Sequence, residues 1–420
     1  MKIDRRFFLG LVIFLIPLFS FAEFDVQDAT NQYLNQLTPE QTAKSNAYFE
    51  GGYWIQLWNL FYGIAVAAIL LFSGLSAKMR DLSERLTRFS FVHNFLFAIQ
   101  YFLLSYVLSF PLSVYLGHIR EHQYDLSNLS FAGWLGESLK GLGIGIIIGG
   151  LFVAVIYKIV KKMPKTWWLA GSVVGCLFLM FISFIFPVFL APVFNDYKPL
   201  PEGEVRDAIL SMARANGIAV DNVYQFDASK QSKRISANVS GLWGTMRISL
   251  NDNLLNRSTK EEIMAVMGHE MGHYVLNHVY KSTIFFTIIL LMAFYFLYWS
   301  MGHLFTGYWK QWGVRDEYDI ALLPFAMSMI SVFFFIFTPI SNSIVRSAES
   351  EADIFGLNAA RQPDGFASTA IKLSEYRKLD PGPWEEVIFF DHPSGRARVE
   401  MAMRWKKENL VEEDSSKPRL

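Results

Sequence analysis

Six long apolar segments constrain this chain more than any other feature. A bilayer core about 30 Å thick is crossed by roughly 20 mostly apolar residues in helical form. Only 18% of the residues are charged, below the roughly 25% that is usual in soluble domains. The sequence therefore predicts a mainly α, multi-pass helical membrane protein, whose spans lie at about 54–75, 92–116, 141–160, 167–190, 281–300 and 321–345.

The first 22 residues admit two interpretations. Lys2, Arg5 and Arg6 precede an apolar run that ends at small residues such as Ala22, which is the pattern of a cleaved signal peptide. A first membrane helix that stays in the protein fits the same residues equally well. The sequence therefore predicts six or seven spans.

Two polar stretches interrupt the apolar segments, and together they have a suitable size for one domain assembled from two pieces. The helix pair between them would anchor this domain to the membrane. The expected organisation is a signal peptide or first helix at 1–22, a membrane-helix region at 23–192, the first part of the polar domain at 193–280, two membrane helices at 281–345, the second part of the domain at 346–405 and a charged tail at 406–420.

Charge does not recruit a nucleic acid, because Lys+Arg and Asp+Glu are equal at 38 each. Membrane lipids are the expected surroundings instead. Positive residues are concentrated in 76–90 and 158–165, whereas 117–130 holds few. The positive-inside rule then places the two basic segments in the cytoplasm. The polar domain would face outward on this interpretation.

The sharpest motif is the H-E-x-x-H formed by His269, Glu270 and His273. The preceding residues predict a helix that begins with a capping box of Ser258 and Glu261. Histidines four residues apart lie on one helix face, where both can bind one zinc ion beside a glutamate that acts as general base. A chance match or a pair of surface histidines is the alternative, and the apolar residues around the motif argue against it.

A catalytic zinc ion needs a third protein ligand and an open position for water. The chain has a single cysteine, Cys176, so a site built on several thiolates is excluded. Glu349 is the candidate ligand, on a helix that continues the last apolar segment. Asp353, one turn later, is placed to accept the spare N–H of a ligating histidine. Without the upstream motif, this acidic run would be more typical of a solvated helix face.

The order of these motifs resembles the CAAX prenyl protease 1 family of integral-membrane zinc endopeptidases, which cut C-terminal to prenylated cysteines. In that family, as here, an H-E-x-x-H is followed after two spans by E-x-x-A-D. Weaker matches extend over nearly the whole chain: Pro192-Val193-Phe194-Asn195 with Lys198, Pro199, Leu200 and Gly203; Gly241, Arg247-Ile248-Ser249-Leu250 and Asp252-Asn253-Leu254-Leu255; and His392-Pro393 with Arg398.

The resemblance implies one Zn²⁺ per chain, held by His269, His273 and Glu349 in a zincin-like domain that carries a small β element. It also implies that Glu270 activates the water. In the same way, it implies that His392 stabilises the oxyanion of the tetrahedral intermediate, as a neutral donor or as an imidazolium. A donor aimed at developing negative charge is among the largest contributions to catalysis. Without the resemblance, His392 would be taken as an ordinary loop histidine.

The segment around Ser236 and Asn238 alternates like an edge strand, which could bind an extended substrate by strand addition. Here the chain departs from the family pattern, which places an asparagine five residues before Gly241, where this chain has Ser236. Whether Asn238 or a backbone group substitutes is open at this point. Arg346 and Arg398 are candidate supporting residues.

The expected function is hydrolysis of peptide or protein substrates, lipid-modified or with hydrophobic ends, in a plasma, inner or endoplasmic reticulum membrane. A membrane quality-control zinc protease for misfolded proteins is the alternative within the same chemistry. A transporter or scaffold with a structural metal site is the alternative of another class, although such a site needs no general base. The family's better-known members work on the cytosolic side, which conflicts with the charge bias of the loops.

Overall fold

The computed structural model describes residues 24–241 and 246–411. The segment interpreted as a signal peptide or first helix lies outside these residues, as does most of the charged tail. The first part of that tail continues the last helix of the chain as a π-helical turn, Lys407–Val411.

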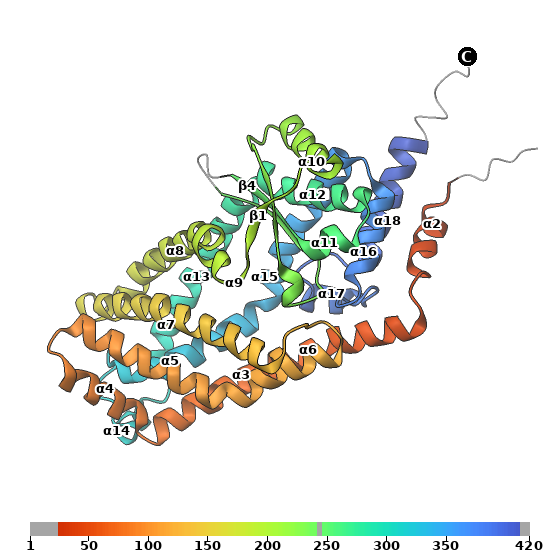
Figure 1. Ribbon diagram of the computed structural model, residues 1–420. Helices are drawn as coiled ribbons and strands as arrows, with labels where there is room; N and C mark the ends of the chain where they lie inside the picture. The colour runs from red at the N-terminus through yellow and green to blue at the C-terminus, as the bar shows by residue number, and fades with distance from the viewer. Residues whose placement is uncertain (1–23, 242–245, 412–420) are drawn as a thin grey trace, which may run out of the picture.

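Within the described residues, six helices are long and apolar enough to cross a membrane, which confirms the six predicted spans. Each of these helices is longer than the roughly 20 residues that cross a bilayer core (Figure 1). The spans are α3 (Pro39–Phe72), α5 (Ser90–Val114) with α6 (Arg120–Gln123), α7 (Phe131–Lys162), α8 (Trp167–Ile185) with α9 (Ala191–Phe194), α13 (His278–His303) and α15 (Leu323–Ala360). The joins within the second and fourth are π-helical turns, Tyr115–Ile119 and Phe186–Leu190.

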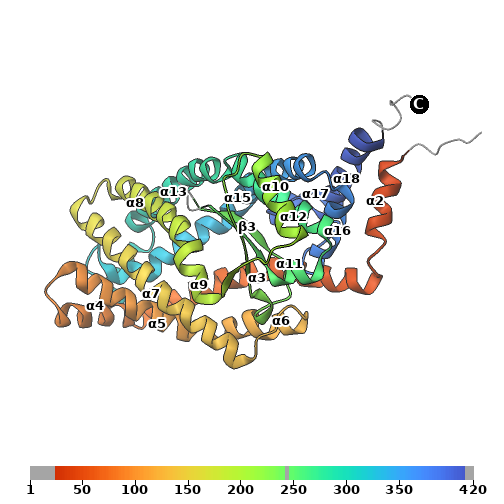
Figure 2. The ribbon, with the colours of Figure 1, turned by 45° about the horizontal axis from the view of Figure 1, so that its top comes forward.

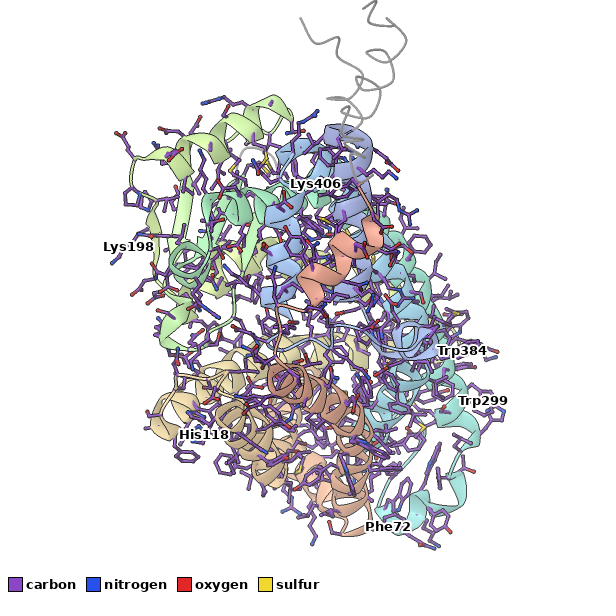
Figure 3. The ribbon with its side chains drawn as sticks, turned by 90° about the vertical axis from the view of Figure 1, so that its right-hand side faces the viewer. Phe72, His118, Lys198, Trp299, Trp384 and Lys406 are labelled. Atoms are coloured by element: carbon purple, nitrogen blue, oxygen red, sulfur yellow. The ribbon has the colours of Figure 1, made fainter. Side chains whose placement is uncertain are left out.

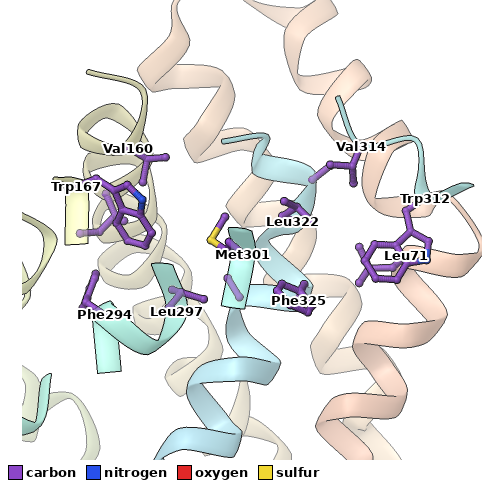
Figure 4. Packing of buried hydrophobic residues seen from close by; sticks show 13 residues of the cluster. Leu71, Val160, Trp167, Phe294, Leu297, Met301, Trp312, Val314, Leu322 and Phe325 are labelled. Carbon is purple, nitrogen blue, oxygen red and sulfur yellow. The ribbon is translucent and has the colours of Figure 1, made fainter. Parts of the chain in front are cut away.

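Aromatic and branched side chains fill the space between several of these helices (Figure 4). Trp167 of α8 packs edge to face against Phe294 of α13, with ring centroids 6.1 Å apart. Gly171 of α8 lies where a Cβ atom would be 2.8 Å from the Phe294 ring. The small residue therefore lets the two helices approach closely, as small residues do in membrane helix packing.

The two ends of the helix bundle differ in what they carry. At one end, α4 (Leu75–Leu86) packs near α14 (Trp309–Trp312), and Arg80 donates to the Gly313 carbonyl at 3.0 Å. At the other end, the backbone amide of Asn128, in the loop between α6 and α7, donates to the Gln231 carbonyl at 3.0 Å. This loop therefore contacts the polar domain. Figure 3 shows Lys198 and Lys406 at this end and Phe72 at the opposite one. The basic segment 76–90, which includes most of α4, thus lies away from the polar domain. The side of the membrane that the polar domain faces stays a prediction.

The polar domain contains a small sheet with the strand order β1-β2-β4-β3. The central strands β2 and β4 are parallel, and each edge strand runs antiparallel to its neighbour. β3 is therefore an edge strand, as its alternation predicted. The elements of this part are β1 (Tyr197–Pro199), α10 (Glu204–Ala215), β2 (Val223–Phe226), the 3₁₀ turn Ala228–Lys230, β3 (Ala237–Ser240), β4 (Arg247–Asn251), α11 (Asp252–Arg257) and α12 (Lys260–Val275).

Helix α12 is buried on two sides. Ile263, Met267 and Met271 recur every fourth residue, and their fully or almost fully buried side chains join the core formed with the sheet and α10. Gly268 and Gly272 face the backbone of α15. One face of α12 therefore packs on the sheet, and another face, lined by glycines, packs closely on α15. The histidines of the motif are held between these two elements.

The start of α12 corrects one prediction. The capping box consists of Thr259 and Glu262, not of Ser258 and Glu261. Ser258 ends the preceding helix α11, so it is not free to begin the next one. The Glu262 carboxylate accepts from the Thr259 amide at 2.7 Å and from the Lys372 ammonium at 2.5 Å, and this second partner comes from a distant element.

The second part of the polar domain begins within α15 and is helical. A separate apolar core joins its first and last helices to α12 and to the N-terminal helix α2 (Val26–Leu34). Figure 2 shows α2 beside α18, so segments from the two ends of the chain pack together. The helices of this part are α16 (Pro363–Leu373), α17 (Pro383–Phe389) and α18 (Gly395–Lys406). The short turns Thr306–Tyr308 and Ile320–Leu322 precede α14 and α15.

Candidate metal centre

Three side chains from two helices converge at one point. The Nε2 atoms of His269 and His273, both on α12, are 3.1 Å apart. Glu349 of α15 places one carboxylate oxygen 3.2 Å from the His269 Nε2 and the other 3.4 Å from the His273 Nε2. This is the group of three that the sequence predicted as ligands, and within the described residues it is the group that could hold a metal ion.

The Nδ1 atoms of both motif histidines have hydrogen-bond partners on the side away from Glu349. The Nδ1 of His269 lies 2.6 Å from the Asp353 carboxylate, and the Nδ1 of His273 lies 2.9 Å from the His278 ring. Neutral rings that donate from Nδ1 leave a bare lone pair on Nε2. Within the described residues, the buried Oε2 of Glu349 also has no hydrogen-bond partner. When both rings carry their hydrogen on Nδ1, the Nε2 lone pairs and the Glu349 carboxylate face one another and are free to bind a cation.

This donor set fits a divalent cation. Imidazole nitrogen binds zinc at about 2.0–2.1 Å in a tetrahedral arrangement, which puts two ligand atoms roughly 3.3 Å apart. The separations of 3.1, 3.2 and 3.4 Å match that spacing. Two imidazoles and one carboxylate leave a coordination position for water, as catalytic zinc sites require.

The close approach of α12 and α15 brings the ligands together. A Cβ atom on Gly356 would lie 2.7 Å from the His269 amide nitrogen, and one on Gly268 would lie 2.9 Å from the Gly356 carbonyl oxygen. Any side chain at these positions would separate the two helices. The glycines next to the motif histidines are thus part of what positions Glu349.

Behind His269 lies a fully buried carboxylate, Asp353. The Arg398 guanidinium donates to both of its oxygens, at 2.9 and 2.6 Å. A carboxylate that accepts the spare N–H of a ligating histidine fixes the ring and raises its basicity. The predicted partner Asp353 and the predicted support Arg398 therefore lie together behind one ligand.

Glu270 and His269 line a cavity of about 200 Å³. Ser236 and Ala237 of the edge-strand segment line one side of this cavity, and His392 lines another. Burial raises the pKa of the Glu270 carboxyl, while the neighbouring histidines act in the opposite direction. A raised pKa suits a group that takes and returns a proton near neutral pH.

His392 lies against the same carboxylate as the two motif histidines. Its Nε2 is 3.1 Å from Glu349, and its Nδ1 is 2.8 Å from Asp391. Arg346 does not join this group. It donates to the backbone carbonyls of Glu386 and Phe390, at 2.9 and 2.5 Å, and so fastens the loop that carries His392.

The two candidate strand residues are placed differently. Ser236, just before β3, lines the cavity that holds Glu270, whereas Asn238 does not. Asn238 pairs with Ser249 of β4, and its side-chain oxygen accepts from Ser240 at 3.1 Å. Of the two positions, Ser236 is the one that faces the reacting groups.

A second cavity, of about 600 Å³, adjoins the metal group from the membrane side. Its walls come from α8, α13 and α15, and they are mainly apolar, with His273, His278 and Glu349 at one end. The apolar walls of this cavity belong to helices long enough to span the membrane. The metal group therefore lies between a polar cavity and an apolar one.

Two residues near the metal group were not given a role by the sequence. His278 contacts a ligand ring directly, because its Nδ1 lies 2.9 Å from the Nδ1 of His273. Glu351, inside the E-x-x-A-D run, lies 3.1 Å from the other nitrogen of His278. The sequence signal for His278 was a third histidine five residues after His273. Its contacts with His273 and Glu351 depend on the turn between α12 and α13.

The fold and this site define a multi-pass membrane protein with a metallopeptidase centre. Two family models match the chain: peptidase family M48 over residues 199–406, and the CAAX prenyl protease N-terminal region, described as five membrane helices, over residues 26–196. Together they cover both the domain with the site and the preceding helices.

Individual relatives agree with the family models. The uncharacterized metalloprotease YhfN of Bacillus subtilis is 30% identical over 84% of this chain and 82% of its own length. The CAAX prenyl protease 1 homolog of Oryza sativa subsp. japonica is 27% identical over 72% and 71%. CAAX prenyl protease 1 of Saccharomyces cerevisiae is 33% identical over 43% and 40%.

The crystal structure of S. mikatae Ste24p has the same fold, with a TM-score of 0.74 at 23% identity over 96% of this chain and 100% of that one. The chain belongs to peptidase family M48, in the group of CAAX prenyl protease 1. It is an integral-membrane metalloendopeptidase of the CAAX protease type.

Proposed function

We propose that this protein hydrolyses peptide bonds with one zinc ion held by His269, His273 and Glu349. The observation that carries the proposal is the convergence of two imidazole nitrogens and a carboxylate at 3.1–3.4 Å. Their other hydrogen-bonding positions are occupied by Asp353 and His278. Such a group is costly to bury unless a cation neutralises it.

Bound zinc supplies Lewis acidity, which polarises the scissile carbonyl and lowers the pKa of water at the site. Glu270 takes one proton from the attacking water, whose oxygen forms the new bond to the carbonyl carbon. When the carbon–nitrogen bond breaks, Glu270 returns that proton to the leaving amine. Its half-buried carboxylate at the cavity wall suits both transfers.

His392 is the proposed donor to the oxyanion. Its Nδ1 is directed at Asp391, so donation from Nε2 requires the imidazolium form. An imidazolium beside the Glu349 carboxylate brings positive charge to the place where negative charge develops. Donors fixed in this way lower the barrier because they need no reorganisation during the reaction.

An extended peptide is the proposed substrate conformation. The open edge of β3 lies between two cavities: Ser236 and Ala237 line the polar one, and Val239 and Ser240 line another of about 380 Å³. Backbone pairing with an edge strand holds a peptide without regard to its sequence. The substrate would then cross the metal group in a fixed register.

The large apolar cavity is the proposed binding site for a hydrophobic or prenylated end of the substrate. It is bounded by α8, α13 and α15, and its polar end reaches Glu349 and His273. A chain of carbon atoms bound there gains roughly 0.8 kcal/mol for each buried CH₂ group. This gain would favour lipid-modified substrates over unmodified peptides.

Glu270→Gln separates the chemistry from metal binding. The variant keeps the size of the side chain but not its ability to take a proton, so kcat for a farnesylated peptide should fall by at least about a hundredfold. Zinc content should remain at one ion per chain. Glu261→Gln, on the exposed side of the same helix, is the matched control and should keep full activity. Full activity of zinc-loaded Glu270→Gln would overturn the mechanism.

A further inference from the structure

His278 has a place in the site that the mechanism above does not use. It begins α13, and its side chain is only 4% exposed. Its Nδ1 lies 2.9 Å from the Nδ1 of His273, with ring centroids 5.0 Å apart. A buried imidazole is thus in direct hydrogen-bond contact with a metal-ligand ring, on the side away from the metal position.

The turn between α12 and α13 creates this contact. Helix α12 ends at Val275, and α13 begins three residues later. Asn277 makes the reversal with φ 58° and ψ 37°, a left-handed conformation that asparagine adopts more readily than most residues. The chain therefore turns sharply enough to bring His278 back beside His273, five residues earlier.

The hydrogen-bond directions follow from the chemistry of the ligand. If His273 binds a cation through Nε2, its hydrogen resides on Nδ1, which then donates to the Nδ1 of His278. The hydrogen of His278 must reside on Nε2, which lies 3.1 Å from the Glu351 carboxylate. The Lys281 ammonium donates to the same oxygen of Glu351 at 2.7 Å. The chain of donors has one consistent direction and ends on a carboxylate.

The two ligand rings are supported in different ways. His269 donates directly to a carboxylate, Asp353, at 2.6 Å. His273 reaches its carboxylate, Glu351, through a second imidazole. Both nitrogens of His278 are occupied in this arrangement, so it is not a fourth ligand.

We propose that His278 is a positioning residue, which fixes the tautomer and orientation of His273 by accepting its Nδ1 hydrogen, with Glu351 as the terminal acceptor. The proposal rests on the metal role given to His273 in the proposed function. The feature that matters is the acceptor atom at Nδ1 of His278. The loss of such a partner typically lowers metal affinity by about 10–100-fold.

Two amide substitutions distinguish this role from simple space filling. In His278→Asn, the amide oxygen stands where Nδ1 stood, so the acceptor for His273 is kept. In His278→Gln, the amide is one methylene farther out, near the position of Nε2, and the acceptor is lost. Both variants are polar and similar in size, so a general folding effect would act on both.

The measurement is the zinc affinity of the purified full-length protein without substrate, by competition with a chromophoric chelator. His278→Gln should bind Zn²⁺ about 10–100-fold more weakly than wild type, and His278→Asn should stay within about threefold. Glu351→Met should weaken affinity, and Glu351→Gln, which keeps an acceptor oxygen, should weaken it less. His303→Gln, at the far end of the same helix, should leave the affinity unchanged.

Equal zinc affinity of wild type, His278→Gln and His278→Asn would overturn the proposal, as would equal losses in the last two. Excess zinc should restore the kcat of His278→Gln, because the acceptor acts on metal binding and not on the substrate. The affinity measurement uses no peptide. If the zinc affinities of wild type and variants fall in the expected order but the wild-type protein cleaves no peptide, the proposed function is contradicted. This proposal then still stands.

Discussion

Asp353 is the side chain through which two remote elements act on one ligand. It accepts the Nδ1 hydrogen of His269 and both donors of Arg398. Asp353→Asn would leave Arg398 buried beside a neutral amide, whose NH₂ group faces a donor. We expect zinc affinity and kcat/KM to fall by about 10–100-fold.

The control for this change is Asp364→Asn, on an exposed face of α16. Asp364 pairs with Tyr33 and Lys406 at the surface, where an ion pair contributes little. Zinc titration and peptide cleavage should be close to wild type for Asp364→Asn. A loss of the same size in both variants would show that the effect is general and not transmitted through His269.

The sequence predicted the residues with fixed helical spacing better than those joined by a turn. His269, His273, Glu349 and Asp353 lie at intervals of four on two helices, so their shared faces follow from helix geometry. The partner of His273 depends on the left-handed Asn277, which spacing alone does not reveal. The same limit explains the misplaced capping box, because the choice of Glu262 is reinforced by the distant Lys372.

At the scale of elements, the contact between α12 and α15 determines whether the ligands meet. Gly356→Ala would place a methyl group 2.7 Å from the His269 amide nitrogen. The helices would have to separate, at a cost of about 1–3 kcal/mol for overpacking. We expect a lower Tm in detergent. We also expect an affinity for zinc at least tenfold lower than that of wild type, because Glu349 moves with α15.

Gly52→Ala is the matched control, since a Cβ atom at Gly52 of α3 has no neighbour within 4 Å. That substitution should leave zinc affinity unchanged and raise stability slightly, because alanine is favoured over glycine inside a helix. A Gly356→Ala protein with wild-type Tm and zinc affinity would show that the helices tolerate a wider spacing.

The elements themselves were largely predictable, but their arrangement was not. Apolar length alone identified the six spans, and alternation identified β3 as an edge strand. The strand order β1-β2-β4-β3 and the packing of α2 against α18 join segments far apart in sequence. No local pattern encodes these pairings, since they depend on burial of side chains from distant parts of the chain.

At the scale of the whole molecule, the apolar cavity between the membrane helices admits a direct test. Cys176 is the single cysteine of the chain and lines this cavity. A bulky, membrane-permeant thiol reagent on Cys176 should occupy the space proposed for the hydrophobic end of the substrate. Cleavage of a farnesylated peptide should fall at least tenfold, mainly through a higher KM, and the peptide should slow the labelling.

Cys176→Ser keeps a group that can bond to Thr287, 3.0 Å away, and cannot react with the reagent. Its activity should therefore be insensitive to the treatment. Labelled wild type that still cleaves the farnesylated peptide at full rate would contradict the assignment of this cavity. Equal inhibition with an unprenylated, unfolded membrane protein as substrate would instead favour a quality-control role.

The central claim is that His269, His273 and Glu349 hold one metal ion for catalysis. The most direct measurement is the zinc content of the purified protein by mass spectrometry, in wild type and in Glu349→Gln. We predict one zinc ion per wild-type chain, almost none in Glu349→Gln after dialysis, and loss of peptide cleavage that follows the loss of zinc. Full zinc occupancy in folded Glu349→Gln, or cleavage by zinc-free wild type, would contradict the account.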